Sequence, residues 1–169
     1  MKQRLFLIAL ILISFQKNYA CICRGGKLPF RSTAQYADFV ALIKILSYDY
    51  VENPTLDNKD RKPSAINVEV IKKYKGKENR KRIKIWGNNG SSCWVNINSF
   101  KVGHYYLVAP YNLGIQATKV QQSQDYAFSF CNVNALSVKY DTQKAYGKYS
   151  KTKQAISLEQ FEKDLGIRK

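Results

Sequence analysis

The sequence predicts a mainly β fold, a small barrel of about five short strands. Short runs rich in β-branched and aromatic residues alternate with glycine, proline and asparagine turn signals along the chain. Four cysteines lie behind an apolar leader, and the cysteines of an exported chain usually form disulfides. The roughly 149 residues after the leader suit one domain with its own core.

Residues 1–20 have the pattern of a signal peptide. Basic residues precede an apolar run of eleven residues, Leu5–Phe15, which is too short to span a bilayer. Cleavage after Ala20 would leave Cys21 as the first residue of the mature chain, so we expect a secreted, periplasmic or extracellular protein. The alternative is a lipid anchor on Cys21, although the residues before Ala20 fit a lipobox poorly. No later run is apolar over a sufficient length, so no transmembrane segment is expected.

The first half of the mature chain contains a predicted helix and two predicted strands. Residues 32–35 read Ser-Thr-Ala-Gln, which resembles a capping box and predicts the start of a short helix. Residues 39–45 predict a strand that is apolar on both faces near its start. Residues 51–63 hold two prolines and several charges and predict a loop, and the alternation in residues 66–70 predicts a half-buried strand.

The middle of the chain predicts a basic turn followed by two strands. Residues 72–82 are the turn, residues 83–86 alternate as a strand, and the loop 87–92 leads to Cys93. A compact apolar strand is predicted for residues 104–109.

Three aromatic residues at every second position precede the last cysteine. They predict a strand with one aromatic face that ends at Cys131: Tyr126, Phe128 and Phe130. Residues 136–169 are a basic C-terminal extension that ends in an amphipathic helix. This helix opens at Ser157, and Gly166 ends it. Its apolar stripe consists of Leu158, Phe161 and Leu165.

The charge of the chain is strongly basic, with a formal net charge of +16. Its densest basic stretch, between residues 72 and 84, predicts a site for polyanions such as lipopolysaccharide or sulfated glycans. The candidate residues are Lys72, Lys73, Lys75, Arg80, Lys81 and Arg82. The alternative is a solvated turn that only aids solubility. An exported protein does not meet nucleic acid as a natural target, so no nucleic-acid partner is expected.

The residue inventory predicts that the chain is not an enzyme and needs no cofactor or metal of its own. His104 is the only histidine and falls within a strand pattern. The sequence offers no metal-ligand cluster, no phosphate loop and no Ser/His/Asp set. A redox pair would normally be Cys-x-x-Cys at a helix start, whereas this chain has Cys-x-Cys in an irregular segment.

The motif Cys21-Ile22-Cys23 stands at the expected mature N-terminus. Its two cysteines are one residue apart, so each needs a distant partner, and the chain offers only Cys93 and Cys131. Counting alone leaves three possible pairings of four cysteines open.

These features together resemble the netrin-like domain, above all the N-terminal domain of the tissue inhibitors of metalloproteinases. An N-terminal Cys-x-Cys, a short helix and the long apolar strand at residues 36–44 carry the likeness. Residues 70–76, which end in Tyr-Lys-Gly, are similar to the family's second strand. Cys93 and residues 103–109 are similar to its next cysteine and strand, and the likeness covers roughly residues 21–131.

The resemblance implies a five-stranded OB-type barrel with flanking short helices over residues 21–135. It also implies the disulfides Cys21–Cys93 and Cys23–Cys131. Each would close a long loop and contribute roughly 4 kcal/mol in the chain-entropy account. The family's third disulfide has no counterpart here, because the chain has only four cysteines.

The functional implication of the resemblance is inhibition of zinc metalloendopeptidases, and we expect the protein to be a monomer. In the family, the N-terminal cysteine chelates the protease zinc through its α-amino nitrogen and carbonyl oxygen, a role that falls here on Cys21. Ile22 would then enter the specificity pocket. Two alternatives remain, because fold does not imply function. Cys-x-Cys could be only a structural staple, and the chain could be a basic binding module for anionic polymers.

Overall fold

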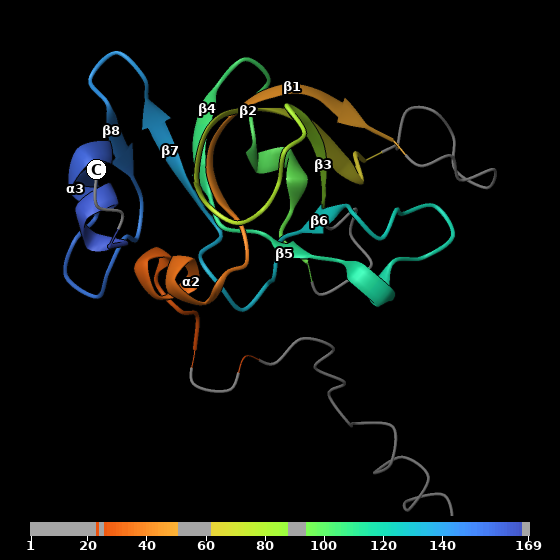
Figure 1. Ribbon diagram of the computed structural model, residues 1–169, viewed down its shortest axis with the longest axis horizontal. Coiled ribbons are helices and arrows are strands. Elements are labelled where there is room, and N and C mark those ends of the chain that lie inside the picture. Colours follow the sequence, from red (N-terminus) through yellow and green to blue (C-terminus); the bar gives the residue numbers. More distant parts are fainter. Residues whose placement is uncertain (1–22, 24–25, 51–61, 88–93, 167–169) are drawn as a thin grey trace, which may run out of the picture.

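Nine strands form a single sheet in the computed structural model, which describes residues 23, 26–50, 62–87 and 94–166 (Figure 1). Their hydrogen-bonded order is β5-β6-β3-β2-β1-β4-β7-β8-β9. The strands are β1 (Val40–Asp49), β2 (Ala65–Lys75), β3 (Arg82–Trp86), β4 (Tyr105–Val108), β5 (Tyr111–Asn112), β6 (Tyr126–Ala127), β7 (Ala135–Lys139), β8 (Lys144–Tyr146) and β9 (Ala155–Ser157).

Within the described ranges, four short helical segments accompany the sheet. They are α2 (Phe30–Tyr36), η2 (Ile97–Ser99), η3 (Gly114–Gln116) and α3 (Leu158–Asp164). The mainly β fold predicted from the sequence is therefore confirmed. No helix among the described residues is long and apolar enough to cross a membrane.

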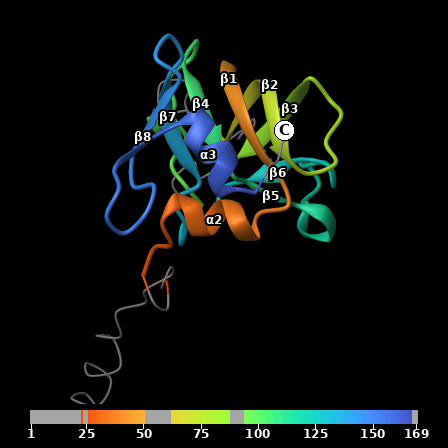
Figure 2. The ribbon, with the colours of Figure 1, turned by 60° about the vertical axis from the view of Figure 1, so that its left-hand side comes forward.

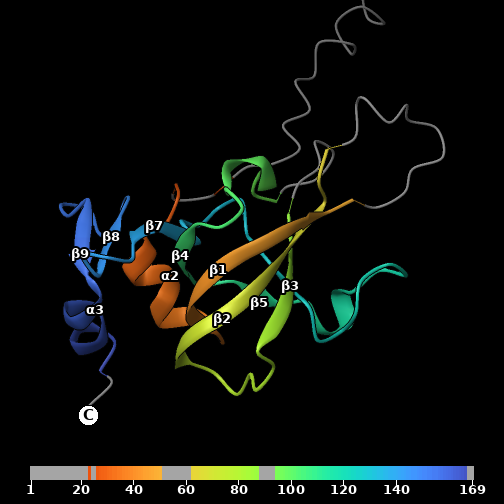
Figure 3. The same ribbon diagram turned by 90° about the horizontal axis from the view of Figure 1, so that it is seen from above.

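β1 is the centre of the sheet, because it pairs with β2 along its whole length and with β4 on its other side. The β1–β2 register shifts at three places, and such bulges bend a strand and increase its twist. Figure 3 shows β1 and β2 as long, strongly twisted strands that cross the molecule side by side. Because of this curvature, the two faces of β1 contribute to two separate hydrophobic cores, an inner one and an outer one.

The inner core is formed by alternate residues of β1 to β4, with side chains such as Ile43, Ile66, Ile85 and Val108. Phe100 after η2 fills the space between them and stacks on Phe128, with 5.1 Å between ring centroids. The period-2 pattern in the sequence is what places these residues on one face.

The outer core lies between the other face of β1 and the two helices α2 and α3 (Figure 2). Phe161 of α3 is its centre and contacts Phe30 of α2 and Tyr74 of β2, with ring centroids 5.9 and 5.3 Å away. Ser157 caps α3 by accepting a hydrogen bond from the backbone N–H of Gln160 at 3.1 Å. The predicted helix and its start at Ser157 are confirmed, and of the apolar stripe Leu158 and Phe161 are buried and Leu165 is partly buried.

The segment after residue 135 belongs to the same sheet and the same outer core. The predicted boundary between residues 135 and 136 falls inside β7, which begins at Ala135 and pairs with β4. The later strands β8 and β9 extend this sheet, and α3 packs on it.

Three local predictions are wrong. α2 begins at Phe30 rather than at residue 32, and Thr33 donates its hydroxyl hydrogen to the carbonyl of Pro29 instead of acting in a capping box. Residues 72–75 belong to β2 because they pair with β1, so the basic turn is shorter than expected. The aromatic strand before Cys131 ends at Ala127, and the chain turns before it reaches β7.

The hydrogen-bonded order of the described strands has two ends, so the five-stranded barrel is not confirmed. The two outer strands of the set β3-β2-β1-β4 nevertheless both pair with strands at the ends of one stretch of chain. β6 pairs in parallel with β3, and β7 pairs antiparallel with β4, and residues 128–134 connect the two.

Candidate functional site

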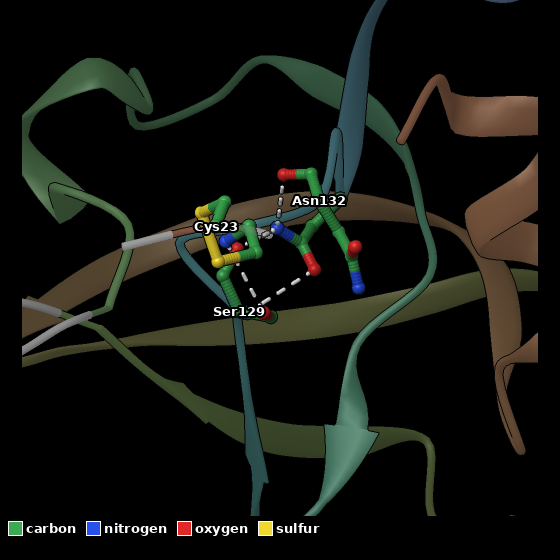
Figure 4. Close-up of a disulfide and its surroundings, with 5 residues drawn as sticks. Cys23, Ser129 and Asn132 are labelled. Carbon is green, nitrogen blue, oxygen red and sulfur yellow. Dashed lines mark hydrogen bonds between the residues drawn. A yellow bond between two sulfur atoms is a disulfide. The ribbon is translucent and has the colours of Figure 1, made fainter. Parts of the chain in front are cut away.

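The N-terminal segment is tied to the body of the protein by a disulfide between Cys23 and Cys131 (Figure 4). Their Cα atoms are 5.2 Å apart, and 108 positions separate them in the sequence. This is the second of the two pairings that the resemblance to the inhibitors implies. The bond fixes the position of Cys23 on the domain.

Backbone hydrogen bonds hold the same segment a few residues further on. The N–H of Leu28 donates to the carbonyl of Cys131 at 3.2 Å, and the N–H of Val133 donates to the carbonyl of Leu28 at 2.9 Å. Leu28 thereby forms a parallel bridge with Asn132. The ammonium group of Lys27 lies 4.3 Å from the centroid of the Phe130 ring, a favourable cation–π distance.

The turn that carries Cys131 is itself stiffened by Asn134, whose side chain is buried. The amide of Asn134 donates to the carbonyls of Ser129 and Asn132, at 2.5 and 2.8 Å. Its oxygen accepts from the N–H of Ser129 at 3.2 Å. Sequence reasoning missed Asn134, because an asparagine in a turn gives no signal that distinguishes it from its neighbours.

The residues predicted to contact a protease lie outside the described part of the chain. These are Cys21 and Ile22, and the same is true of Cys93, the expected partner of Cys21. The Cys21–Cys93 disulfide and the zinc contact therefore remain predictions.

Some residues of the basic stretch form ion pairs or hydrogen bonds within the protein, and others face a groove that is described below. Lys72 forms an ion pair with Glu162 of α3, and Lys75 donates to the carbonyl of Gln35 in α2 at 2.8 Å. Lys73 donates to the backbone carbonyl of Glu78 at 2.8 Å. Lys81 is 80% exposed and lies 3.4 Å from Glu69. The structure thus does not gather all six candidates into one site.

Arg80 is held by a carboxylate that is almost completely shielded from water. Glu78, with 8% of its side chain exposed, accepts from Nη2 and Nε of Arg80 at 2.6 and 3.0 Å. The hydroxyl of Tyr126 donates to the same carboxylate at 3.1 Å. The hydrogen bond from Arg80 lowers the pKa of Glu78 to about 2, and burial raises the pKa of Tyr126 to about 12. The guanidinium group is therefore fixed in place.

A groove of about 510 Å³ runs over the outer face of β1, β2 and β3, and the chain before β6 forms its wall. Ser47, Asn67 and Lys84 occupy facing positions on the three strands, about 5 Å apart from strand to strand. The groove is lined by Leu46, Ser47, Asn67, Arg80, Arg82, Ile83, Lys84, Val120, Gln122 and Asp125. Two of the six predicted polyanion residues, Arg80 and Arg82, are among them.

Among the described residues, Asp125 is the only carboxylate that lines the groove, and it accepts hydrogen bonds from other groups of the protein. Asp125 is 5% exposed, and its carboxylate accepts from the indole N–H of Trp86 at 2.9 Å and from the N–H of Gln122 at 3.1 Å. Elsewhere in the described residues, no three His, Cys, Asp or Glu side chains lie close enough to hold a metal ion together. The groove therefore presents cations and neutral hydrogen-bonding groups.

The chain matches no family model, and no curated protein matches it. The assignment of a function therefore depends on the residues and geometry described above.

Proposed function

We propose that this chain is an exported inhibitor of zinc metalloendopeptidases that acts through its N-terminal Cys21-Ile22-Cys23 segment. The observation that supports the proposal is the attachment of this segment at Cys23 to Cys131 and at Leu28 to the same turn. Anchors at these two positions lower the conformational entropy that the segment has to lose when it binds, and pre-organisation of this kind favours tight inhibition.

The chemistry required of Cys21 is simple. A catalytic zinc keeps one coordination position open for water or substrate. An α-amino group titrates near neutral pH, so its unprotonated form is available to coordinate that zinc. The carbonyl oxygen of the same residue would be the second ligand, and Ile22 would place an apolar side chain in the neighbouring pocket.

The finer architecture that goes with this proposal is an OB-type barrel of five strands. Its support is the stretch of residues 126–139, which supplies a neighbour to β3 through β6 and to β4 through β7. The inner core enclosed by β1 to β4 agrees with such a barrel. An experimental structure in which residues 128–134 leave β3 and β4 far apart would contradict it.

Export and cleavage after Ala20 are part of the proposal, because the mechanism requires a free amine on Cys21. Intact mass and N-terminal sequencing of the exported protein should give a chain that begins at Cys21 without modification. A mass increased by acyl chains would instead identify the lipid-anchored alternative and remove the zinc-chelating amine.

The decisive experiment adds one alanine before Cys21. An extra residue converts the amine into an amide, which has no basic lone pair, so inhibition of a panel of secreted zinc endopeptidases should be abolished. An alanine added after Lys169 is the control and should change nothing. Ile22→Gly should weaken inhibition by on the order of 2–4 kcal/mol, because a buried apolar side chain is removed. If the extended form inhibits as well as the parent, or the parent inhibits no enzyme at micromolar concentration, Cys-x-Cys is only a staple.

A second candidate function is a basic binding module for anionic polymers of cell surfaces or the extracellular space. It is favoured by the net charge, +16 for the whole sequence and +13 without residues 1–20, and by the groove that presents Arg80, Arg82 and Lys84. The module predicts retention on a heparin-type column that falls steeply as salt is raised.

A further inference from the structure

The geometry points to a binding site for an acidic polysaccharide in the groove across β1, β2 and β3. Arg82 and Lys84 would contact carboxylate or sulfate groups, and Ser47 and Asn67 would contact sugar hydroxyls. This inference rests on the second candidate function above and adds its location and ligand class. It is independent of the N-terminal segment.

The shape of the groove suits an extended chain rather than a compact ion. Its volume of about 510 Å³ far exceeds that of a single phosphate or sulfate, and its floor crosses three strands. The segment between η3 and β6 forms the side of the groove and lies beside β3 (Figure 3). A ligand could therefore lie across the three strands.

The charges that face the groove differ in how free they are to bind. Within the described residues, Arg82 forms no ion pair, and Glu69, which faces it across the sheet, pairs with Lys81. Arg80 is fixed by Glu78 and by the carbonyl of Gln124. Its guanidinium group therefore contributes positive potential to the groove from a fixed position. Lys84 pairs with Asp49, and both side chains are about one-third exposed, so this pair can open toward a ligand anion.

The neutral groups of the groove match the hydroxyl-rich part of a sugar chain. The side-chain amide of Asn67 donates to the hydroxyl of Ser47 at 3.2 Å, and this pair lies beside Lys84 on the same face. An amide and a hydroxyl can each donate and accept, as sugar hydroxyls do. None of the described lining residues is aromatic. The groove therefore lacks the rings on which proteins stack the bases of single-stranded nucleic acid.

The test compares two matched pairs of variants by calorimetry with a heparin oligosaccharide and with polygalacturonate. Arg82→Ser with Lys84→Ser should weaken binding by roughly tenfold or more, because two charge-assisted contacts are lost. Lys139→Ser with Lys144→Ser removes the same charge from β7 and β8, outside the groove, and should weaken binding by less than about threefold.

A second pair of substitutions leaves the basic residues in place. Val120→Asp puts a negative charge in the groove wall, and Val102→Asp puts it on a turn outside the groove; the two valines are 59% and 48% exposed. Both variants should fold, because neither side chain is buried. Val120→Asp should weaken binding by several-fold, whereas Val102→Asp should have little effect.

The outcomes separate the inference from the function on which it rests. If the two double serine variants lose affinity equally, and the two aspartate variants also lose it equally, only net charge matters. The proposed groove site is then wrong, while the basic binding module stands. If the parent binds neither polysaccharide at low salt, the module and the groove are both wrong. If it binds oligodeoxythymidine more tightly than either polysaccharide at the same salt, the ligand class is wrong.

Discussion

The two candidate sites of this protein are held by different kinds of interaction. At the N-terminal site, Cys23 is fixed by a disulfide and Leu28 by backbone hydrogen bonds to the same turn, and the amide of Asn134 supports that turn. The groove is built from charged side chains, and its Arg80 depends on the carboxylate of Glu78. The first site should therefore respond to reduction and the second to pH and salt. Perturbations of one kind can test each site separately.

The largest effect should come from removal of the disulfide. Cys23→Ala with Cys131→Ala should lower the free energy of unfolding by about 4–5 kcal/mol, because the bond closes a loop of 108 positions in the unfolded chain. Urea unfolding measures this loss. Inhibition should disappear with it, while polysaccharide binding by the remaining folded protein should persist. A loss below about 1 kcal/mol would show that the backbone hydrogen bonds alone hold the segment.

Loss of the Glu78 carboxylate should have the next largest effect. Its pKa is about 2 in the folded protein against an ordinary value of 4.5, chiefly because of the hydrogen bond from Arg80. The ionised form therefore stabilises the fold above the ordinary pKa, and this stabilisation is lost progressively as pH falls from 4.5 toward 2. The whole contribution is on the order of 3 kcal/mol.

Glu78→Gln should reproduce that loss at neutral pH and flatten the acid limb of the stability profile. Thermal unfolding between pH 2 and pH 7 is the measurement. Because Arg80 then loses its fixed position, polysaccharide binding should weaken while protease inhibition stays unchanged. An unchanged acid limb in the variant would mean that another carboxylate is responsible.

The smallest effect is expected at Lys81. This residue was one of the six predicted polyanion ligands, but its side chain is 80% exposed and pairs only with Glu69. Lys81→Ser should change the free energy of unfolding by less than about 1 kcal/mol, as for other exposed ion pairs. It should also weaken polysaccharide binding less than Arg82→Ser does. An equal effect of the two substitutions would extend the site beyond the groove.

The parts of the fold that sequence could predict are those set by local periodicity. Alternation identified residues 66–70 and 83–86 as strands, and the cap at Ser157 with its apolar stripe identified α3. The mainly β class follows from the same pattern. These features depend on residues a few positions apart, which the sequence displays directly.

The parts that sequence could not predict depend on partners far apart in the chain. In the sequence, Lys72 and Lys75 have the pattern of ligand-binding residues. In the fold, Lys72 pairs with Glu162 of α3, and Lys75 donates to the carbonyl of Gln35 in α2. The groove needs three strands and the chain before β6 to meet, so it has no linear signature. Asn134 also has no signature in the sequence, because its role depends on the hydrogen bonds that it makes within the folded turn.

The position of Phe161 has a consequence for how the chain folds. Its ring contacts Phe30 and Tyr74, so the outer core joins residues from the two ends of the described chain. Contacts over such a sequence separation form slowly, because a long loop must close first. During synthesis, α2 would emerge long before α3 and would keep its apolar face exposed until the last turn arrives. A newly made chain therefore passes through a state that is open to aggregation or to a chaperone, and truncation before Leu158 should prolong it.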